Sequence, residues 1–133
     1  MADATATEPT FGLAALGQIA LTAHDLDRAT AFYRDVLRLP FLFRVPNLAF
    51  FDCAGVRLML GPPEPAAPNH PGSTLYFRVN DLDAAYAILD DRGVPFTDRP
   101  HLVAEMPDHA LWMAFFTDTE GNTLALMSEV RQP

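Results

Sequence analysis

Residues 18–41 read QIALTAHDLDRATAFYRDVLRLPF, and residues 74–96 repeat their pattern as TLYFRVNDLDAAYAILDDRGVPF. The triplet Asp-Leu-Asp occurs at 25–27 and again at 81–83, an offset of 56 residues, and the pair Pro-Phe follows in each copy at an offset of 55. One deleted residue reconciles the two offsets. Internal similarity at a fixed period predicts two copies of one supersecondary unit.

Each copy is predicted to begin as a strand followed by a helix. Residues 19–22 and 75–79 are rich in β-branched, aliphatic and aromatic side chains, and an Asp suited to an N-cap follows each run, at Asp25 and Asp81. Apolar residues then recur at helical spacing, which predicts one helix face packed on a sheet. Gly93 fits a left-handed position after the second helix, whereas the first helix either holds Arg38 at that position with some strain or ends differently.

The later parts of the copies align as well, but at a larger offset. GVRLML at 55–60 matches GNTLAL at 121–126 at an offset of 66, and each glycine is predicted to sit in a hairpin turn. The second copy therefore contains 11 additional residues between Phe96 and Leu111. The segment 100–112 holds two of the four histidines, and we predict that it is a loop that crosses the mouth of a cleft as a lid, with a solvated loop whose histidines are incidental as the alternative.

Composition restricts the classes of function. The chain has 133 residues, 50% of them hydrophobic, and a net charge of −8, which opposes binding to nucleic acid and to anionic membranes. Cys53 is the only cysteine, so a cytoplasmic protein without a disulfide is expected. Neither a signal peptide nor a membrane-spanning run of roughly 20 apolar residues is evident.

The repeat also sets the expected domain organisation. Residues 1–14 lack periodicity and are expected to be flexible. Residues 15–130 are expected to form one domain of two modules, at about 16–60 and about 73–130. The segment 61–72 holds five prolines and is expected to link them.

With two βαβββ units, Asp-Leu-Asp helix starts, Phe32-Tyr33 and the DTEGN turn at 118–122, the chain resembles the vicinal oxygen chelate superfamily of glyoxalase I, bleomycin resistance proteins and extradiol dioxygenases. The resemblance implies an α+β fold in which two modules in a pseudo-twofold arrangement form a curled mixed sheet around a cleft. It also implies a homodimer, in some members with each cleft completed by the partner subunit.

Metal-dependent members of that superfamily bind a divalent ion through His, Gln and Glu at four inward positions. By this resemblance the positions fall on Gln18, Met59, Thr74 and Ala125, of which only Gln18 fits the pattern. A divalent cation requires imidazole or carboxylate ligands to balance its charge. No metal and no other cofactor is therefore expected, with a divalent metal as the alternative.

Several further residues are candidates for ligand contact. Period-two alternation places Tyr76 and Arg78 on the face of Thr74, Arg57 on that of Met59, and Met127 and Glu129 on that of Ala125. Arg57 and Arg78 could bind an anionic substrate or pair with acidic residues, and for Arg57 we favour pairing. His101, His109 and Trp112 belong to the predicted lid, and Trp112 could instead be core.

Two classes of function remain open. The first is a protein that binds a small, partly aromatic molecule in a metal-free cleft. The second is a lyase, isomerase or epimerase that acts through His101, with Glu129 as a further catalytic candidate, or through a metal held by other ligands.

Overall fold

A computed structural model of the chain describes residues 11–63 and 72–131. The first module comprises β1 (Gln18–Thr22), α1 (Leu26–Ala31), the π-helix η1 (Phe32–Val36), β2 (Phe41–Val45), β3 (Leu48–Cys53) and β4 (Val56–Gly61). The second comprises β5 (Leu75–Arg78), α2 (Leu82–Asp91), β6 (His101–Glu105), β7 (His109–Thr117) and β8 (Thr123–Arg131). The predicted α+β repeat of two βαβββ modules is confirmed.

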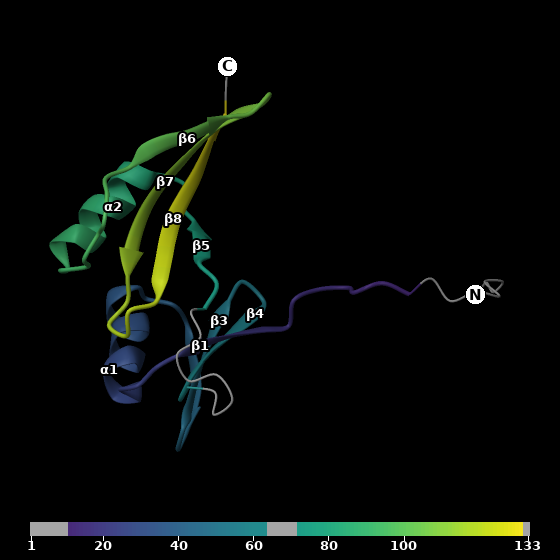
Figure 1. The fold of residues 1–133 in the computed structure, drawn as a ribbon, viewed down its shortest axis with the longest axis vertical. Coiled ribbons are helices and arrows are strands. Elements are labelled where there is room, and N and C mark those ends of the chain that lie inside the picture. Colours follow the sequence, from purple (N-terminus) through teal and green to yellow (C-terminus); the bar gives the residue numbers. More distant parts are fainter. Residues whose placement is uncertain (1–10, 64–71, 132–133) are drawn as a thin grey trace.

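The eight strands form two hydrogen-bonded sheets, one in each module, with orders β1-β4-β3-β2 and β5-β8-β7-β6. The first strand of each module runs parallel to the last, and the other pairs are antiparallel. In Figure 1 both helices lie on the left of the strands of their own module, so one side of each sheet is left without a helix. We call these uncovered sides the first and the second open face.

The helix-covered sides share one apolar core. Leu21, Leu60 and Phe51 of the first sheet pack with Tyr33, and they belong to the same cluster of buried residues as Leu124 and other side chains of the second sheet. Both predicted N-caps are confirmed, because the carboxylates of Asp25 and Asp81 accept hydrogen bonds from backbone N–H groups of the first helical turn. Local chemistry therefore starts each helix, and burial against the sheet stabilises it.

The end of each helix explains how the first copy differs from the second. The first helix changes to π-helical hydrogen bonding, in which the N–H of Leu37 reaches the carbonyl of Phe32 at 3.0 Å. Arg38 follows with a φ of 61°, at the position where Gly93 has a φ of 87° after α2. The first helix thus ends differently from the second and also holds Arg38 in the left-handed region, which a side chain disfavours and glycine does not.

The segment 100–112 is a β-hairpin rather than the predicted loop. Its residues form β6 and the start of β7, which pair antiparallel from His101↔Met113 to Glu105↔Ala110. The additional residues lengthen strands, since β7 and β8 have nine residues each and β3 and β4 have six. The additional residues of the second copy were predicted to form a loop. Two neighbouring strands can instead take up additional residues by becoming longer and pairing with each other.

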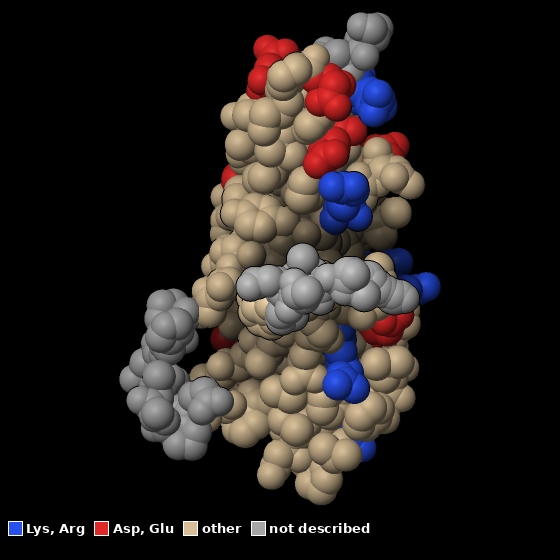
Figure 2. Space-filling model, turned by 90° about the vertical axis from the view of Figure 1, so that its right-hand side faces the viewer, with Lys and Arg blue, Asp and Glu red and all other residues tan. Residues whose placement is uncertain are grey.

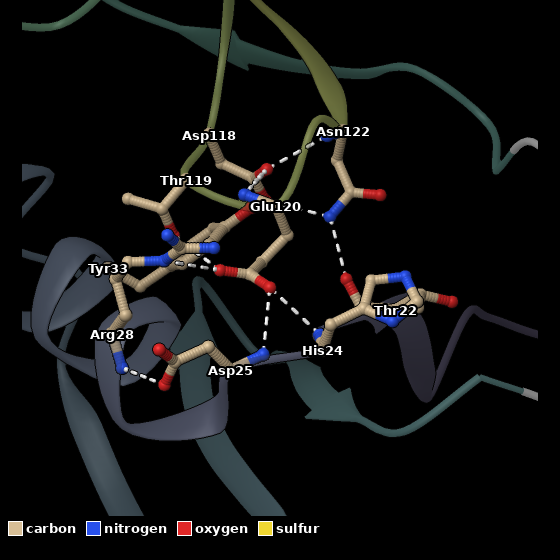
Figure 3. A network of polar contacts seen from close by, with 9 residues as sticks. All are labelled: Thr22, His24, Asp25, Arg28, Tyr33, Asp118, Thr119, Glu120 and Asn122. Carbon is tan, nitrogen blue, oxygen red and sulfur yellow. Dashed lines mark hydrogen bonds and ion pairs between the residues drawn. The ribbon is translucent and has the colours of Figure 1, made fainter.

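The turn at 118–122 joins the second module to the first (Figure 3). Glu120 accepts hydrogen bonds from the backbone N–H groups of His24 and Asp25 and from Nε of Arg28. Asp118 accepts a hydrogen bond of 2.6 Å from the buried hydroxyl of Tyr33. These contacts fix the start of α1 against the β7–β8 turn and so set the relation between the two modules.

Some predicted features lie partly outside the described residues. Residues 1–10 of the predicted flexible terminus and residues 64–71 of the predicted linker belong to this group. Residues 11–17 are described and have no regular secondary structure. Within the described ranges, no helix combines the length and the apolar character needed to cross a bilayer.

Candidate functional site

The first open face carries aromatic and polar side chains from four strands. Phe43 of β2 stacks on Phe50 of β3 with ring centroids 4.5 Å apart. Arg57 of β4 lies over the same Phe50 ring, with its guanidinium carbon 5.5 Å from the centroid. Nε of Arg57 donates a 2.9 Å hydrogen bond to Oε1 of Gln18 on β1, and the amide nitrogen of Gln18 points at the sulfur of Met59.

Sheet register brings these residues together. Gln18 is opposite Arg57 in the β1–β4 pair, and Phe50 is opposite Met59 in the β3–β4 pair. Alternation along each strand sends the intervening residues, such as Leu58 and Phe51, into the core. The face is therefore a consequence of strand pairing, with two apolar rings, one thioether, one amide and one guanidinium side by side.

The expected pairing of Arg57 with an acidic residue is wrong within the described part of the chain. Asp52 is its neighbour across the β3–β4 pair, but the Asp52 carboxylate accepts from the backbone N–H of Gly55 in the turn. Arg78 is the arginine that pairs, with Nη2 located 3.2 Å from Oε2 of Glu129. Pairing, which was left open for Arg78 and expected for Arg57, is therefore found at Arg78.

The second open face gathers most of the candidates of the second module. Tyr76 meets Phe115 edge to face at 5.9 Å, and the fully buried Ala125 lies between them in the β5-β8-β7 register. Further along the same strands, Met127 is opposite Arg78, and Glu129 pairs with Arg78. Both helices lie on one side, so the two open faces lie on the opposite side. Figure 2 shows this side as a mostly uncharged surface, with acidic and basic residues mixed at its upper end and further basic residues lower down.

A mainly apolar cavity of about 310 Å³ lies where the two modules meet. Its lining includes Ile19 and Leu58 of the first module and Thr74, Tyr76 and Phe77 of the second. Thr74 and Tyr76, both predicted as ligand-binding residues, therefore border space that a small molecule could enter. The thiol of Cys53 also borders this cavity, and burial together with the nearby Asp52 raises its pKa, which disfavours the reactive thiolate.

The two candidate histidines are not brought together. His101 is opposite Met113, four residues along β7 from His109, which corresponds to roughly 13 Å along a strand. Nδ1 of His101 lies 2.8 Å from the carbonyl oxygen of Arg99, and Nδ1 of His109 lies 2.8 Å from the Asp108 carboxylate. The hydrogen bond from His109 lowers the pKa of Asp108.

His109 borders a second, polar cavity of about 300 Å³ at the end of the second open face. This cavity is also lined by Arg78, Asp108, Glu129 and Arg131. The Arg78–Glu129 and His109–Asp108 pairs offset much of its charge. The catalytic candidates are therefore separated, since Glu129 is here and His101 is further along the hairpin.

Trp112 lies on the other side of β7 from Met113 and Phe115. It packs against the core and lines a cavity of about 390 Å³ with Leu82 of α2 and the buried Ser128. Its contacts are therefore with the helix-covered side, in agreement with the alternative in which Trp112 is core.

The residues at the four inward positions do not fit a divalent metal. Oε1 of Gln18 already accepts from Arg57, whose positive charge would repel a cation. The Asp52 carboxylate, across the strand pair from Arg57, is engaged by the turn at Gly55. Met59 offers a thioether, Ala125 offers no donor, and Thr74 offers a hydroxyl. Among the described residues, no three His, Cys, Asp or Glu side chains are grouped to hold a metal ion.

Phe43 and Phe50 are residues of this face that the sequence interpretation missed. Both lie in runs of aromatic residues, where Phe51 is buried in the core and the exposed Phe41 meets its ring at 5.5 Å. Alternation relative to Met59 was the available signal, since Phe50 directly opposes Met59 across the β3–β4 hairpin.

The solved structures most useful for comparison share the whole fold. A lactoylglutathione lyase from Agrobacterium tumefaciens is 26% identical, with a TM-score of 0.71 over 88% of this chain and 95% of the other. TnmS3, an antibiotic binding protein from Streptomyces sp. CB03234, is 24% identical, with a TM-score of 0.72 over 90% of this chain and 98% of the other. No curated protein sequence matches the chain.

The family comparison covers the repeat from which the fold was predicted. The model of the Glyoxalase/Bleomycin resistance protein/Dioxygenase superfamily matches residues 15–126, which include the first module, the turn at 118–122 and the second module as far as the first part of β8. The chain therefore belongs to the Glyoxalase/Bleomycin resistance protein/Dioxygenase superfamily.

Proposed function

We propose that the protein binds a small, partly aromatic molecule on its open faces without the help of a metal ion. The observation that carries this proposal is the arrangement around Gln18, whose amide oxygen accepts from Arg57 while Phe43 and Phe50 stack beside them. Stacked rings and a thioether favour an aromatic ligand, because such pairs add about 0.5–1.5 kcal/mol to simple burial.

Two further observations support a binding role. The cavity at the module junction has a mainly apolar lining that includes Tyr76 and Phe77, which suits a molecule of modest size. The structural similarity to TnmS3 shows that this fold also serves an antibiotic binding protein. Function resides in the site rather than in the fold, so the side chains of the first open face decide the test.

The test uses 2-naphthamide, a neutral aromatic probe, and isothermal titration calorimetry. Phe43 is 45% exposed, so Phe43→Ala should leave the melting temperature nearly unchanged and weaken probe binding about tenfold through the lost ring contact. Ile88→Ala is the matched control, because Ile88 is 51% exposed on α2, on the helix-covered side. Dialysis against a chelator should leave the affinity unchanged. Equal affinity in Phe43→Ala and in the unaltered protein would contradict the proposal, as would loss of binding with the chelator.

A second candidate, an isomerase- or lyase-type enzyme, is favoured by the geometry of His101. A carbonyl oxygen can only accept, so Nδ1–H of His101 donates to Arg99, which leaves Nε2 as the ring nitrogen that can accept a proton. The ring is exposed, and strand register places it beside Met113 on the second open face. Such an imidazole is suited to take a proton from a bound carbonyl compound.

Proton exchange tests this candidate without knowledge of the substrate. In D₂O the enzyme should speed exchange of the α-protons of 2-hydroxyacetophenone, followed by proton NMR, and His101→Gln should reduce that rate by at least a factor of 100. His109→Gln should keep the rate, since its ring lies roughly 13 Å away along the hairpin. Exchange no faster with the unaltered protein than in buffer would eliminate the candidate.

A further inference from the structure

Arg57 is held in place on one edge and free on the other. Its Nε is engaged by Gln18 and its guanidinium lies over the Phe50 ring, so the position of the group is fixed by one hydrogen bond and one stacking contact. The terminal nitrogens Nη1 and Nη2 have no hydrogen-bond or ion-pair partner in the part of the chain that the structure describes. An exposed pair of parallel N–H donors therefore remains beside two aromatic rings.

This guanidinium forms no ion pair within the described part of the chain, although acids are plentiful. The chain has 17 acidic and 9 basic residues, and four of the arginines, at positions 28, 34, 44 and 78, pair with carboxylates. Asp52 lies directly across the strand pair from Arg57 and is engaged by the turn at Gly55. A fixed guanidinium without a counter-ion on an apolar face has the arrangement of an anion-binding group.

From these contacts we infer that Arg57 binds the anionic group of the ligand and that the ligand class is small aromatic carboxylates. This inference rests on the proposed binding function and adds the charge of the ligand to it. The planar edge formed by Nη1 and Nη2 matches the two oxygens of a carboxylate, and the aromatic part of the ligand then lies toward Phe50 and Phe43. The guanidinium is positively charged, as a metal ion would be, and therefore attracts a carboxylate. It needs no metal-binding side chains to do so.

The net charge of −8 does not prevent this binding at ordinary ionic strength. Exposed charges further away than a Debye length of about 8 Å are largely screened at 0.15 M salt, so the nearest group dominates. Asp52 is the one carboxylate opposite Arg57 in the strand pair, and its Oδ1 is turned to the backbone N–H of Gly55 rather than to the guanidinium. An anion that reaches the face therefore meets one fixed positive group close at hand.

The experiment compares 2-naphthoate with its neutral analogue 2-naphthamide by calorimetry at 0.15 M salt. The unaltered protein should bind the carboxylate about tenfold or more tightly than the amide, since a hydrogen bond to a charged group contributes more than a neutral one. Arg57→Gln should weaken naphthoate binding about 10- to 100-fold and change naphthamide binding by less than about twofold. Arg57→Lys keeps the charge without the planar edge and should recover only part of the loss.

Arg34→Gln is the control for net charge, because Arg34 pairs with its neighbour Asp35 on η1, on the helix-covered side. It should leave both affinities unchanged. Equal affinities of the unaltered protein for naphthoate and naphthamide would overturn the inference, as would equal losses of naphthoate affinity in Arg57→Gln and Arg34→Gln. In either case, binding of naphthamide would still support the proposed function. If neither probe binds the unaltered protein at millimolar concentration, both the inference and the proposed function fail.

Discussion

Glu120 is a single residue that joins the two modules. Its carboxylate accepts from the backbone N–H groups of His24 and Asp25 at 2.8 and 2.9 Å and from Nε of Arg28 at 3.1 Å, and its side chain is only 1% exposed. Burial acts to raise the pKa of Glu120, but the donors from Asp25, Thr119, Arg28 and His24 outweigh it and hold this pKa below its usual value. The charge also lies at the N-terminus of α1, where the helix dipole favours an anion.

Glu120→Gln should therefore lower the free energy of unfolding by about 1–3 kcal/mol, because the amide keeps the shape but loses the charge-assisted hydrogen bonds. Urea denaturation followed by circular dichroism measures the change. Asp83→Asn is the control, since Asp83 is an exposed acid in the first turn of α2, and it should change the free energy by less than about 0.5 kcal/mol.

The same residue predicts a dependence of stability on pH. In the unfolded chain the pKa of Glu120 is near 4.3, and in the folded protein it is lower. As the pH falls below about 4.3, the unfolded state therefore binds a proton before the folded state does. The free energy of unfolding decreases as the pH falls through the lowered folded pKa. Glu120→Gln has no such titrating group. The difference in the free energy of unfolding between the unaltered protein and this variant should therefore shrink as the pH falls below about 4.3. An energy difference between the two proteins that is constant from pH 7 to pH 3 would contradict this assignment.

Elements were predictable where the cause is local, and the misses have non-local causes. The N-caps at Asp25 and Asp81 and the left-handed Gly93 follow from neighbouring residues, so the sequence predicted them. The β6–β7 hairpin did not follow, because whether additional residues form a loop or longer strands depends on pairing across the sheet. The partner of Arg57 was missed for the same reason, since parallel pairing of β1 with β4 brings Gln18 beside it.

The candidate site was predictable only as a set of inward positions. The resemblance placed Gln18 and Met59, and alternation along a strand placed Tyr76 and Arg78, at positions that lie on the open faces. Alternation does not predict which side chains on one face of a sheet contact each other. The Arg78–Glu129 ion pair is therefore known only from the structure. It also gave two possible sides for Trp112, and packing of α2 on β7 decides between them.

At the scale of the whole molecule, a substantial apolar surface remains unburied. Residues 11–17 extend away from both sheets in Figure 1, and Phe11, Leu13 and Leu16 are 86%, 93% and 68% exposed. The edge strand β2 is exposed along its length, including Phe41, Leu42 and Val45, and so is most of β6 at the edge of the other sheet. Exposed apolar edges of this kind are normally covered by another chain.

We therefore expect a homodimer in which the apolar residues of the segment 11–17 pack against a second copy of the chain. A closed twofold arrangement covers both segments at once and leaves no further copy to recruit, which accounts for a dimer rather than a fibre. Light scattering at micromolar concentration should give about twice the 14.6 kDa mass of one chain. The combined variant Phe11→Ser, Leu13→Ser and Leu16→Ser should shift the mass toward the monomer, because each change removes roughly 1.5–3 kcal/mol of buried side chain. Ala14→Ser with Ala15→Ser alters the same segment without removing large apolar groups and should leave the dimer intact. A monomeric mass for the unaltered protein would contradict the dimer, and an unchanged dimer in the triple variant would show that this segment does not form the contact.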